Sequence, residues 1–396
     1  MARLSSRPMT GRLDIGIAGC GIGGLALAIR LSDIGHKVSL FDRFDAPQPV
    51  GSGLVIQPVG KVCLDRLGLM RAAIQRGRPI HRLHGIESAS RRTVLRADYS
   101  QVGGDDYGLA IHRADLFDLL FSAARQRPCD IVPSAEIVAT GLTGSERTLS
   151  TVDGRRFGSF DLVVDASGSR SPLSPIKTKA LPYGALWSTV QWPEDTALPT
   201  DHLSQCYRGA HHMLGVLPLS DDGRTAIFWS EPTDRLSEWF QCDLDDWKRK
   251  AVALWPEFRP FAEQITTHDQ MIPARYRHGT LAKPYGLHIA YIGDAAHQAS
   301  PQLGQGANMA LLDAMGLADA LEGRDLPDAL ATYAKRRKTH VRFYQTVSDV
   351  FTPLYQSGSP VPPFLRNNVF HPASQVWPAT RMLTRLISGR LVPTGV

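Results

Sequence analysis

The stretch DIGIAGCGIGGLALAIRLSDIGHKVSLFDR, Asp14 to Arg43, decides how the fold begins. Ile15–Ala18 form a short apolar run typical of a buried strand, and the glycine-rich turn Gly19–Gly24 follows directly. The apolar spacing over 25–34 predicts a helix, and 38–41 predicts a second strand. A strand, a G-x-G-x-x-G turn, a helix and a second strand form the βαβ unit that binds dinucleotides.

Each residue type in this unit has a physical role. Gly19 permits the tight turn, Gly21 lets the backbone approach a pyrophosphate, and Gly24 lets the helix pack close to the strand. The free N–H groups of the helix N-terminus favour phosphate. Asp42 ends the second strand, where a carboxylate can accept hydrogen bonds from ribose hydroxyls. The alternative is a purely structural glycine turn, and the unit alone does not distinguish NAD from FAD.

A second glycine-rich stretch, YIGDAAHQASPQLGQGANMALLDA, spans Tyr291–Ala314. It predicts a strand that ends near Asp294, a loop, and a helix that opens around Gly304–Asn308. FAD is long enough to need both glycine loops. The first would hold its pyrophosphate, and the second its ribityl chain, through Asp294, and the edge of its flavin ring. A plain NAD dehydrogenase would leave the second loop unexplained.

Several motifs together resemble the single-component FAD monooxygenases of the p-hydroxybenzoate hydroxylase type. The similarity covers roughly three quarters of the chain and is carried by GxGxxG at Gly19–Gly24, Asp42-Arg43, GSGLVIQPVGKVCLDRLGL (Gly51–Leu69), IHRADLFDLL (Ile111–Leu120), GDAAHQASPQLGQGAN (Gly293–Asn308) and the C-terminal FTPLYQSGSPVPPFLRNNVF. The residues expected to bind FAD are Gly19, Gly21, Ile22, Gly23, Gly24, Asp42, Arg43, Gly53, Arg113, Asp294, Pro301, Gly304, Gln305, Gly306, Ala307 and Asn308.

The resemblance implies an oxidoreductase that uses NADPH or NADH, as a transient electron donor, and O2. In such enzymes O2 adds at flavin C4a, and the resulting hydroperoxide hydroxylates a small aromatic or heteroaromatic substrate. Arg113 would reach the phosphate or ribityl region of FAD, and Pro301 would lie beside the reactive face of the ring. No side chain need act as a covalent catalyst, because the cofactor supplies the redox chemistry.

One family motif is altered. Where the family has an Asp-Gly pair linked to FAD and NAD(P)H, this chain has Ser167-Gly168, and Ser174 stands at a later family Arg; Arg170 is a nearby substitute. Loss of a carboxylate removes a strong hydrogen-bond acceptor. The alternative is therefore an oxidase, halogenase or N-hydroxylase that receives reduced flavin from a separate reductase. A binding protein that has lost the cofactor is a further alternative, which the intact Gly293–Asn308 motif argues against.

Composition excludes several other classes. The chain has 396 residues, of which 43% are hydrophobic and 21% charged, and a formal net charge of +6. The basic residues are dispersed, so nucleic-acid binding is not expected. Five scattered cysteines without a CxxC pair favour reduced thiols and predict neither a disulfide framework nor a metal site. Without an apolar run that could span a membrane, or a secretory signal, we expect a cytoplasmic protein, either monomer or homodimer.

The expected fold is α/β, a Rossmann-like FAD-binding domain with an inserted, largely antiparallel β-sheet substrate domain. The predicted divisions are 11–75, 101–180 and 276–328 for FAD binding, 76–100 and 181–275 for the substrate domain, and 329–396 for a C-terminal helical segment.

The substrate chamber has several aromatic, histidine and methionine candidates. They are Tyr183, Tyr207, His211, His212, Met213 and Trp229, each of which could equally be a core residue. His211 or His212 could deprotonate a phenol, since histidine titrates near neutrality. His297, close to the flavin, is expected to make a structural hydrogen bond.

Overall fold

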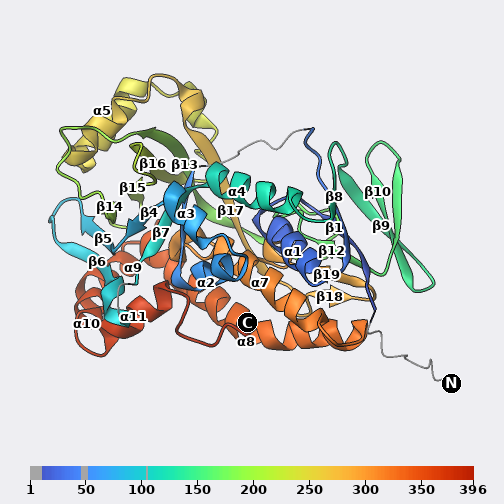
Figure 1. The fold of residues 1–396 in the computed structure, drawn as a ribbon. Coiled ribbons are helices and arrows are strands. Elements are labelled where there is room, and N and C mark those ends of the chain that lie inside the picture. The colour runs from blue at the N-terminus through green and yellow to red at the C-terminus, as the bar shows by residue number, and fades with distance from the viewer. Residues whose placement is uncertain (1–10, 46–51, 104–105) are drawn as a thin grey trace.

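The computed structural model describes residues 11–45, 52–103 and 106–396. Its first layer is a six-stranded sheet in the order β18-β19-β12-β1-β2-β8, parallel except for β18 at one edge. The strands are β1 (Asp14–Ala18), β2 (Lys37–Phe41), β8 (Cys129–Val132), β12 (Leu162–Asp165), β18 (Tyr285–Gly286) and β19 (Ile289–Tyr291). The expected Rossmann-like sheet is therefore present, on the right of Figure 1.

The helices beside this sheet include both that the glycine loops predict. Helix α1 (Ile22–Asp33) begins directly after Gly21, three residues earlier than the apolar pattern indicates. It packs against α4 (Arg113–Arg125) and α7 (Gly306–Leu321), which is the helix expected after the second loop. Small and apolar residues make up most of the buried positions along α1 and α7, and α7 also buries Asn308 and Asp313. This packing brings the two helix N-termini, distant in sequence, into one domain.

The second layer is an eight-stranded sheet in the order β20-β17-β13-β16-β15-β14-β5-β6. Its strands are β5 (Arg82–Glu87), β6 (Thr93–Asp98), β13 (Lys179–Gln191), β14 (His202–Arg208), β15 (His212–Pro218), β16 (Arg224–Pro232), β17 (Ile272–Thr280) and β20 (His297–Gln298). All neighbours are antiparallel except β14 and β5. The predicted largely antiparallel sheet is confirmed, and the expected boundary at 275/276 falls inside β17.

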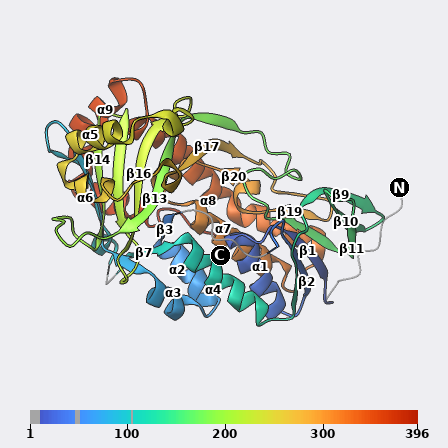
Figure 2. The same cartoon turned by 90° about the horizontal axis from the view of Figure 1, so that it is seen from above.

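Alternation along these strands gives the sheet two different faces. Leu214 and Trp229 belong to a core with Trp247 of α5 (Leu244–Leu254), which covers the outer face in Figures 1 and 2. Their neighbours Met213 and Phe228 point the other way, into the interior between the two layers. A shift of one residue in register would exchange the two sets.

The remaining elements are two small sheets and the other helices. Two small sheets have the orders β3-β7-β4 and β11-β10-β9, with β3 (Gly53–Ile56), β4 (Arg78–Ile80), β7 (Gly108–His112), β9 (Ile137–Thr143), β10 (Glu146–Thr151) and β11 (Arg156–Phe160). The other helices are α2 (Pro58–Arg66), α3 (Met70–Arg76), α6 (Arg259–Ala262), α8 (Leu326–Tyr355), α9 (Val361–Leu365), α10 (His371–Ser374) and α11 (Ala379–Ile387). Helix α8 runs beneath both layers in Figure 1, and α9 to α11 complete the predicted helical end. Within the described ranges no helix is both long and apolar enough to cross a membrane.

Candidate active site

One cavity of about 460 Å³ is lined by residues from both the expected FAD-binding part of the fold and the eight-stranded sheet. One end is lined by residues of both glycine-rich loops, among them Gly21 and Gly306. The other end is lined by the inner face of the eight-stranded sheet, including Trp187 and Phe228, and by α8. The two glycine loops and the aromatic strands, recognised separately in the sequence, therefore border one space.

The N-terminus of α1 has room for a phosphate group. Gly21 is its N-cap, no side chain caps the helix, and the first turn contains no acidic residue. A Cβ at Gly21 would meet no atom within 4 Å, whereas one at Gly24 would lie 2.0 Å from the carbonyl oxygen of Gly19. Gly24 is thus required by packing, and Gly21 leaves open space at a helix N-terminus that favours anions.

Asp42 makes hydrogen bonds to the backbone on both sides of the end of β2. Its Oδ2 accepts a hydrogen bond of 2.7 Å from the backbone N–H of Cys20, and its Oδ1 accepts one of 3.2 Å from that of Phe44. The carboxylate thus holds the glycine turn against the end of β2. The neighbouring Arg43 lies over the Phe44 ring at 4.8 Å. Neither Asp42 nor Arg43 lines the cavity, and the same is true of Gly19 and Gly24.

The second glycine loop forms an equally open cradle. Gly304 has a φ of +60°, which favours glycine, and a Cβ at Gly306 would meet nothing within 4 Å. Helix α7 starts there without a side-chain cap. Asp294 and Arg113 line the cavity nearby. Asp294 is open to the cavity, but desolvation by the surrounding protein raises the pKa of its carboxyl, and the charges of His297 and Arg113 oppose this shift. Open backbone N–H groups, a carboxylate and a cation fit the pyrophosphate, ribityl and flavin parts of FAD.

Most of the expected FAD residues meet at this cavity. Those that line it are Gly21, Ile22, Gly23, Gly53, Arg113, Asp294, Pro301, Gly304, Gln305, Gly306 and Ala307. Gly51, at the start of one matching stretch, lies outside the described residues.

The buried side chain of Asn308 links three backbone segments beside the cavity. Its Oδ1 accepts from the N–H of Gln57 at 2.8 Å, and its Nδ2 donates to the carbonyls of Val55 at 3.2 Å and Gly304 at 2.9 Å. The side chain is fully buried and does not line the cavity. Asn308 therefore fixes the end of β3 and the start of α2 to the second glycine loop.

Asn308→Leu is expected to lower the free energy of unfolding by about 2–4 kcal/mol, because it leaves buried backbone groups without partners. Urea denaturation followed by circular dichroism measures the change. Asn368→Leu, on the exposed C-terminal surface, is the matched control and should change stability by less than about 0.5 kcal/mol. Equal unfolding midpoints for the two variants would contradict the structural role of Asn308.

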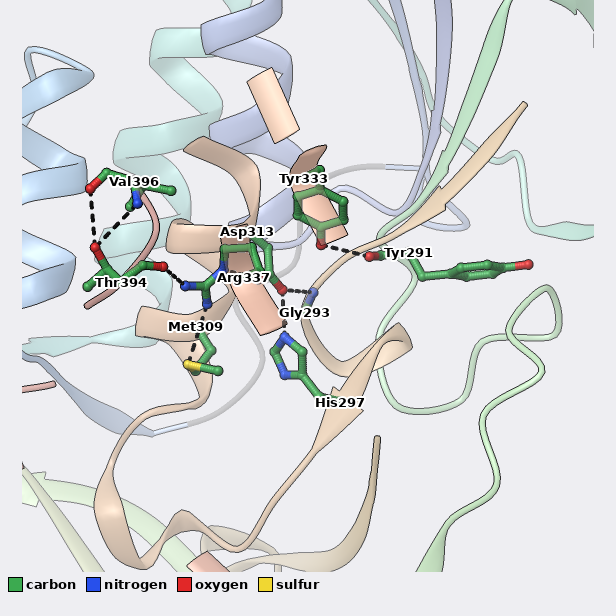
Figure 3. A network of polar contacts seen from close by, with 9 residues as sticks. All are labelled: Tyr291, Gly293, His297, Met309, Asp313, Tyr333, Arg337, Thr394 and Val396. Carbon is green, nitrogen blue, oxygen red and sulfur yellow. Dashed lines mark hydrogen bonds and ion pairs between the residues drawn. The ribbon is translucent and has the colours of Figure 1, made fainter. Parts of the chain in front are cut away.

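A buried ionic network fixes the approach to the second loop (Figure 3). Asp313 of α7 accepts hydrogen bonds from His297 Nε2 at 2.6 Å, from the Gly293 N–H at 2.9 Å and from Arg337 Nε at 2.8 Å. Arg337, on α8, also donates to the carbonyl of Thr394. His297 makes a structural hydrogen bond as expected. The network joins Gly293 and His297, which precede the second glycine loop, to α7, α8 and Thr394 close to the C-terminus.

The altered motif around Ser167 and Gly168 has a carboxylate, Asp165, two residues before Ser167. Asp165, fully buried at the end of β12, accepts from the Ser167 N–H at 3.1 Å, the Ser167 hydroxyl at 2.6 Å and the Ser171 hydroxyl at 2.5 Å. Burial raises its pKa, which these hydrogen bonds partly offset. The Ser174 hydroxyl donates to the carbonyl of Ala295 at 2.6 Å, so this loop is tied to the second glycine loop, while Arg170 is exposed.

The candidates for the substrate end divide according to strand face. Tyr207, Met213 and Pro301 line the cavity. His212 and Trp229 do not: their rings pack together at 5.2 Å, and the Trp229 indole N–H donates to Glu231 at 2.6 Å. His211 is exposed in the turn before β15, and Tyr183 also lies off the cavity. The structure therefore does not bring either histidine to a position where it could deprotonate a bound phenol.

Several lining residues were missed by sequence reasoning. They include Gln57, Gln205, Tyr276, Gln345, Ser348, Tyr355 and Gln356. The available signal was the polar spacing of 345, 348, 352 and 356, which places one stripe of hydrogen-bonding side chains along a helix.

Comparisons with known proteins agree with this geometry. A family model described as the FAD binding domain matches residues 12–347. A FAD-dependent urate hydroxylase of Mycolicibacterium vanbaalenii is 27% identical, with 82% of this chain and 84% of that protein covered. A 3-hydroxybenzoate 6-hydroxylase of Klebsiella oxytoca is 25% identical, over 80% of this chain and 82% of that one.

Solved structures share the fold. 2-Methyl-3-hydroxypyridine-5-carboxylic acid oxygenase superposes with a TM-score of 0.80 at 21% identity, covering 97% of this chain and 100% of the other. PqsL of Pseudomonas aeruginosa in complex with 2-aminobenzoylacetate gives 0.79 at 21% identity, covering 90% and 99%. With the family model spanning most of its length, the chain belongs to the FAD binding domain family, within the p-hydroxybenzoate hydroxylase type of FAD-dependent monooxygenases.

Proposed function

We propose that this protein hydroxylates a small aromatic or heteroaromatic substrate, with FAD as cofactor and NAD(P)H and O2 as co-substrates. The observation that carries the proposal is the one cavity that connects both glycine loops to an aromatic-walled chamber. Two relatives are named as hydroxylases of small ring compounds, urate and 3-hydroxybenzoate. The relatives named as hydroxylases do not favour the alternative of a halogenase or oxidase.

The protein's own residues would bind FAD and orient its flavin ring. The N–H groups of the α1 N-terminus would hold the pyrophosphate near Gly21, and Asp294 and Arg113 would hold the ribityl and phosphate groups. The N-terminus of α7 would stabilise negative charge at the edge of the reduced ring. Bound FAD supplies the transfer of electrons to O2 and of oxygen to the substrate.

The chamber walls would exclude water from the reacting ring. Trp187, Phe228 and Leu217 line the sheet side of the cavity, and apolar walls reduce side reactions with solvent. In the described part of the cavity the sole histidine is His297, whose Nε2 is bound to Asp313. We therefore assign no side chain as a general base.

Direct reduction by NAD(P)H is part of the proposal. The carboxylate that the altered motif lacks at position 167 has a counterpart in Asp165, which orders the same loop through Ser167 and Ser171. A carboxylate therefore still orders this loop by accepting hydrogen bonds, although it lies at the end of β12 and not in the loop itself. This supports a self-contained enzyme over one that depends on a separate reductase.

The test is anaerobic titration of the FAD-saturated protein with NADPH and then NADH, while the absorbance of oxidised flavin is followed. A panel of phenols and quinolones is added in turn. We expect bleaching that one ring compound accelerates, and then, in labelled O2, transfer of an oxygen label to that compound. Bleaching by dithionite but by neither nicotinamide, with every compound tried, would refute direct reduction and indicate a partner reductase.

A further inference from the structure

Helix α8 and its C-terminal cap place three neutral polar side chains on the wall of the cavity. Gln345, Ser348 and Gln356 all line it and are 7%, 2% and 2% exposed. Gln345 Oε1, the Ser348 hydroxyl and both polar atoms of the Gln356 amide lack a hydrogen-bond partner among the described residues. The same helix does pair a neighbouring polar group, since the Thr352 hydroxyl donates to the Ser348 carbonyl at 2.6 Å.

Unpaired buried amides cost free energy unless a ligand or water completes them. A third amide lies on β14: Gln205 lines the cavity, and among the described residues its Nε2 contacts the Met213 sulfur at 3.8 Å. Each glutamine amide offers a donor and an acceptor. The polar groups near the chamber thus suit a ring that presents both kinds of group.

Two arginines lie at or near the cavity, and only one of them lines it. Among the lining residues in the described part of the chain, Arg113 is the only arginine or lysine, and it lies with Asp294 and the glycine loops. Arg366 is buried nearby, but it does not line the cavity and lies against the rings of Tyr207 and Tyr355, at 4.8 and 5.3 Å. Its Nη1 donates to the Leu354 carbonyl at 3.0 Å and its Nε to Asn367 at 2.8 Å, while its Nη2 has no partner among the described residues.

We propose that the chamber selects a neutral ring with adjacent hydrogen-bond donor and acceptor, such as a cyclic amide or carboxamide, and discriminates against ring carboxylates. Gln345 and Gln356 are the specificity-determining residues. A carboxylate here would lose its hydration without direct contact to a cation, because Arg366 does not line the cavity and lies against Tyr207 and Tyr355. The inference rests on the proposed function, because it assigns the chamber to the substrate of that reaction.

The test measures binding to the oxidised FAD-loaded protein, by perturbation of the flavin absorbance and without nicotinamide. Two matched pairs are compared: 3-hydroxybenzamide with 3-hydroxybenzoate, and 2-quinolone with 2-quinolone-4-carboxylate. In at least one pair we expect the neutral ring to bind at least about 10-fold more tightly. Gln345→Met and Gln356→Met, which keep side-chain volume, should each weaken binding of that neutral ring by about 3- to 10-fold.

Gln375→Met, at an exposed position, is the matched control and should leave every affinity unchanged. Retained flavin absorbance in each variant shows that the FAD site is intact. Equal or tighter binding of the carboxylates, no binding of either neutral ring, or unchanged affinities in both α8 variants would overturn the inference. Because binding needs no turnover, a neutral ring that binds selectively but is never hydroxylated would refute the proposed function alone.

Discussion

Asp313→Asn is expected to lower the free energy of unfolding by about 3–5 kcal/mol, the usual cost of breaking a buried ion pair by removing one partner. Asp313 is 1% exposed, and its carboxylate faces both His297 and Arg337, which is also 1% exposed. Without the negative charge, the Arg337 guanidinium stays buried with no opposite charge. Urea denaturation of the FAD-loaded protein measures the loss.

The same carboxylate predicts how stability depends on pH. Burial alone would raise the pKa of Asp313, but His297 and Arg337 outweigh it and lower the pKa from its usual 3.8 to about 2. A depressed folded-state pKa stabilises the protein above about pH 4, and this contribution is lost as the pH falls toward about 2. The wild type should therefore lose about 2 kcal/mol more than Asp313→Asn over that interval.

Asp349→Asn, on the exposed face of α8, is the matched control and should retain wild-type stability. Asp313→Asn should also weaken FAD binding, because Asp313 holds the Gly293 N–H next to Asp294. A variant with wild-type stability and an unchanged acid profile would show that the network in Figure 3 contributes nothing net to the fold.

The local parts of the fold were predictable from the sequence, because their signals are local. A glycine turn between an apolar strand and a helix specifies its own geometry, and both α1 and α7 begin at such turns. The open space at Gly21 and Gly306 agrees with the sequence interpretation of these residues. The role of Asn308 was not predictable in the same way, since its partners at 55 and 57 lie some 250 residues earlier.

The chamber could be predicted only in part, because strand alternation shows two faces without saying which is inward. His212 and Met213 are neighbours on β15, as Phe228 and Trp229 are on β16, and only Met213 and Phe228 line the cavity. The packing of α5 on the outer face decides this, and it depends on tertiary contacts. In the same way, the hydrogen bonds of Ser167 and Ser171 to Asp165 depend on a loop conformation that the motif does not encode.

Gly21→Val is expected to weaken FAD binding by about 100-fold, or about 2.7 kcal/mol, while the protein still folds. Gly21 adopts φ −84° and ψ −176°, an extended conformation open to valine, and its Cβ would meet no protein atom within 4 Å. The chain itself therefore tolerates the side chain. The added atoms would occupy the space through which the backbone approaches the pyrophosphate. Titration of the apoprotein with FAD, followed by flavin fluorescence, measures the loss.

Two further glycine variants separate binding from folding. Gly358→Val also has open space around its Cβ but lies on an exposed loop after α8, so FAD affinity should not change. Gly24→Ala should lower the unfolding midpoint as well as the affinity, because its Cβ would lie 2.0 Å from a backbone oxygen that cannot move aside alone. If Gly21→Val bound FAD as the wild type does, the pyrophosphate could not lie at the N-terminus of α1. The first glycine loop would then serve only the packing that Gly24 already demonstrates.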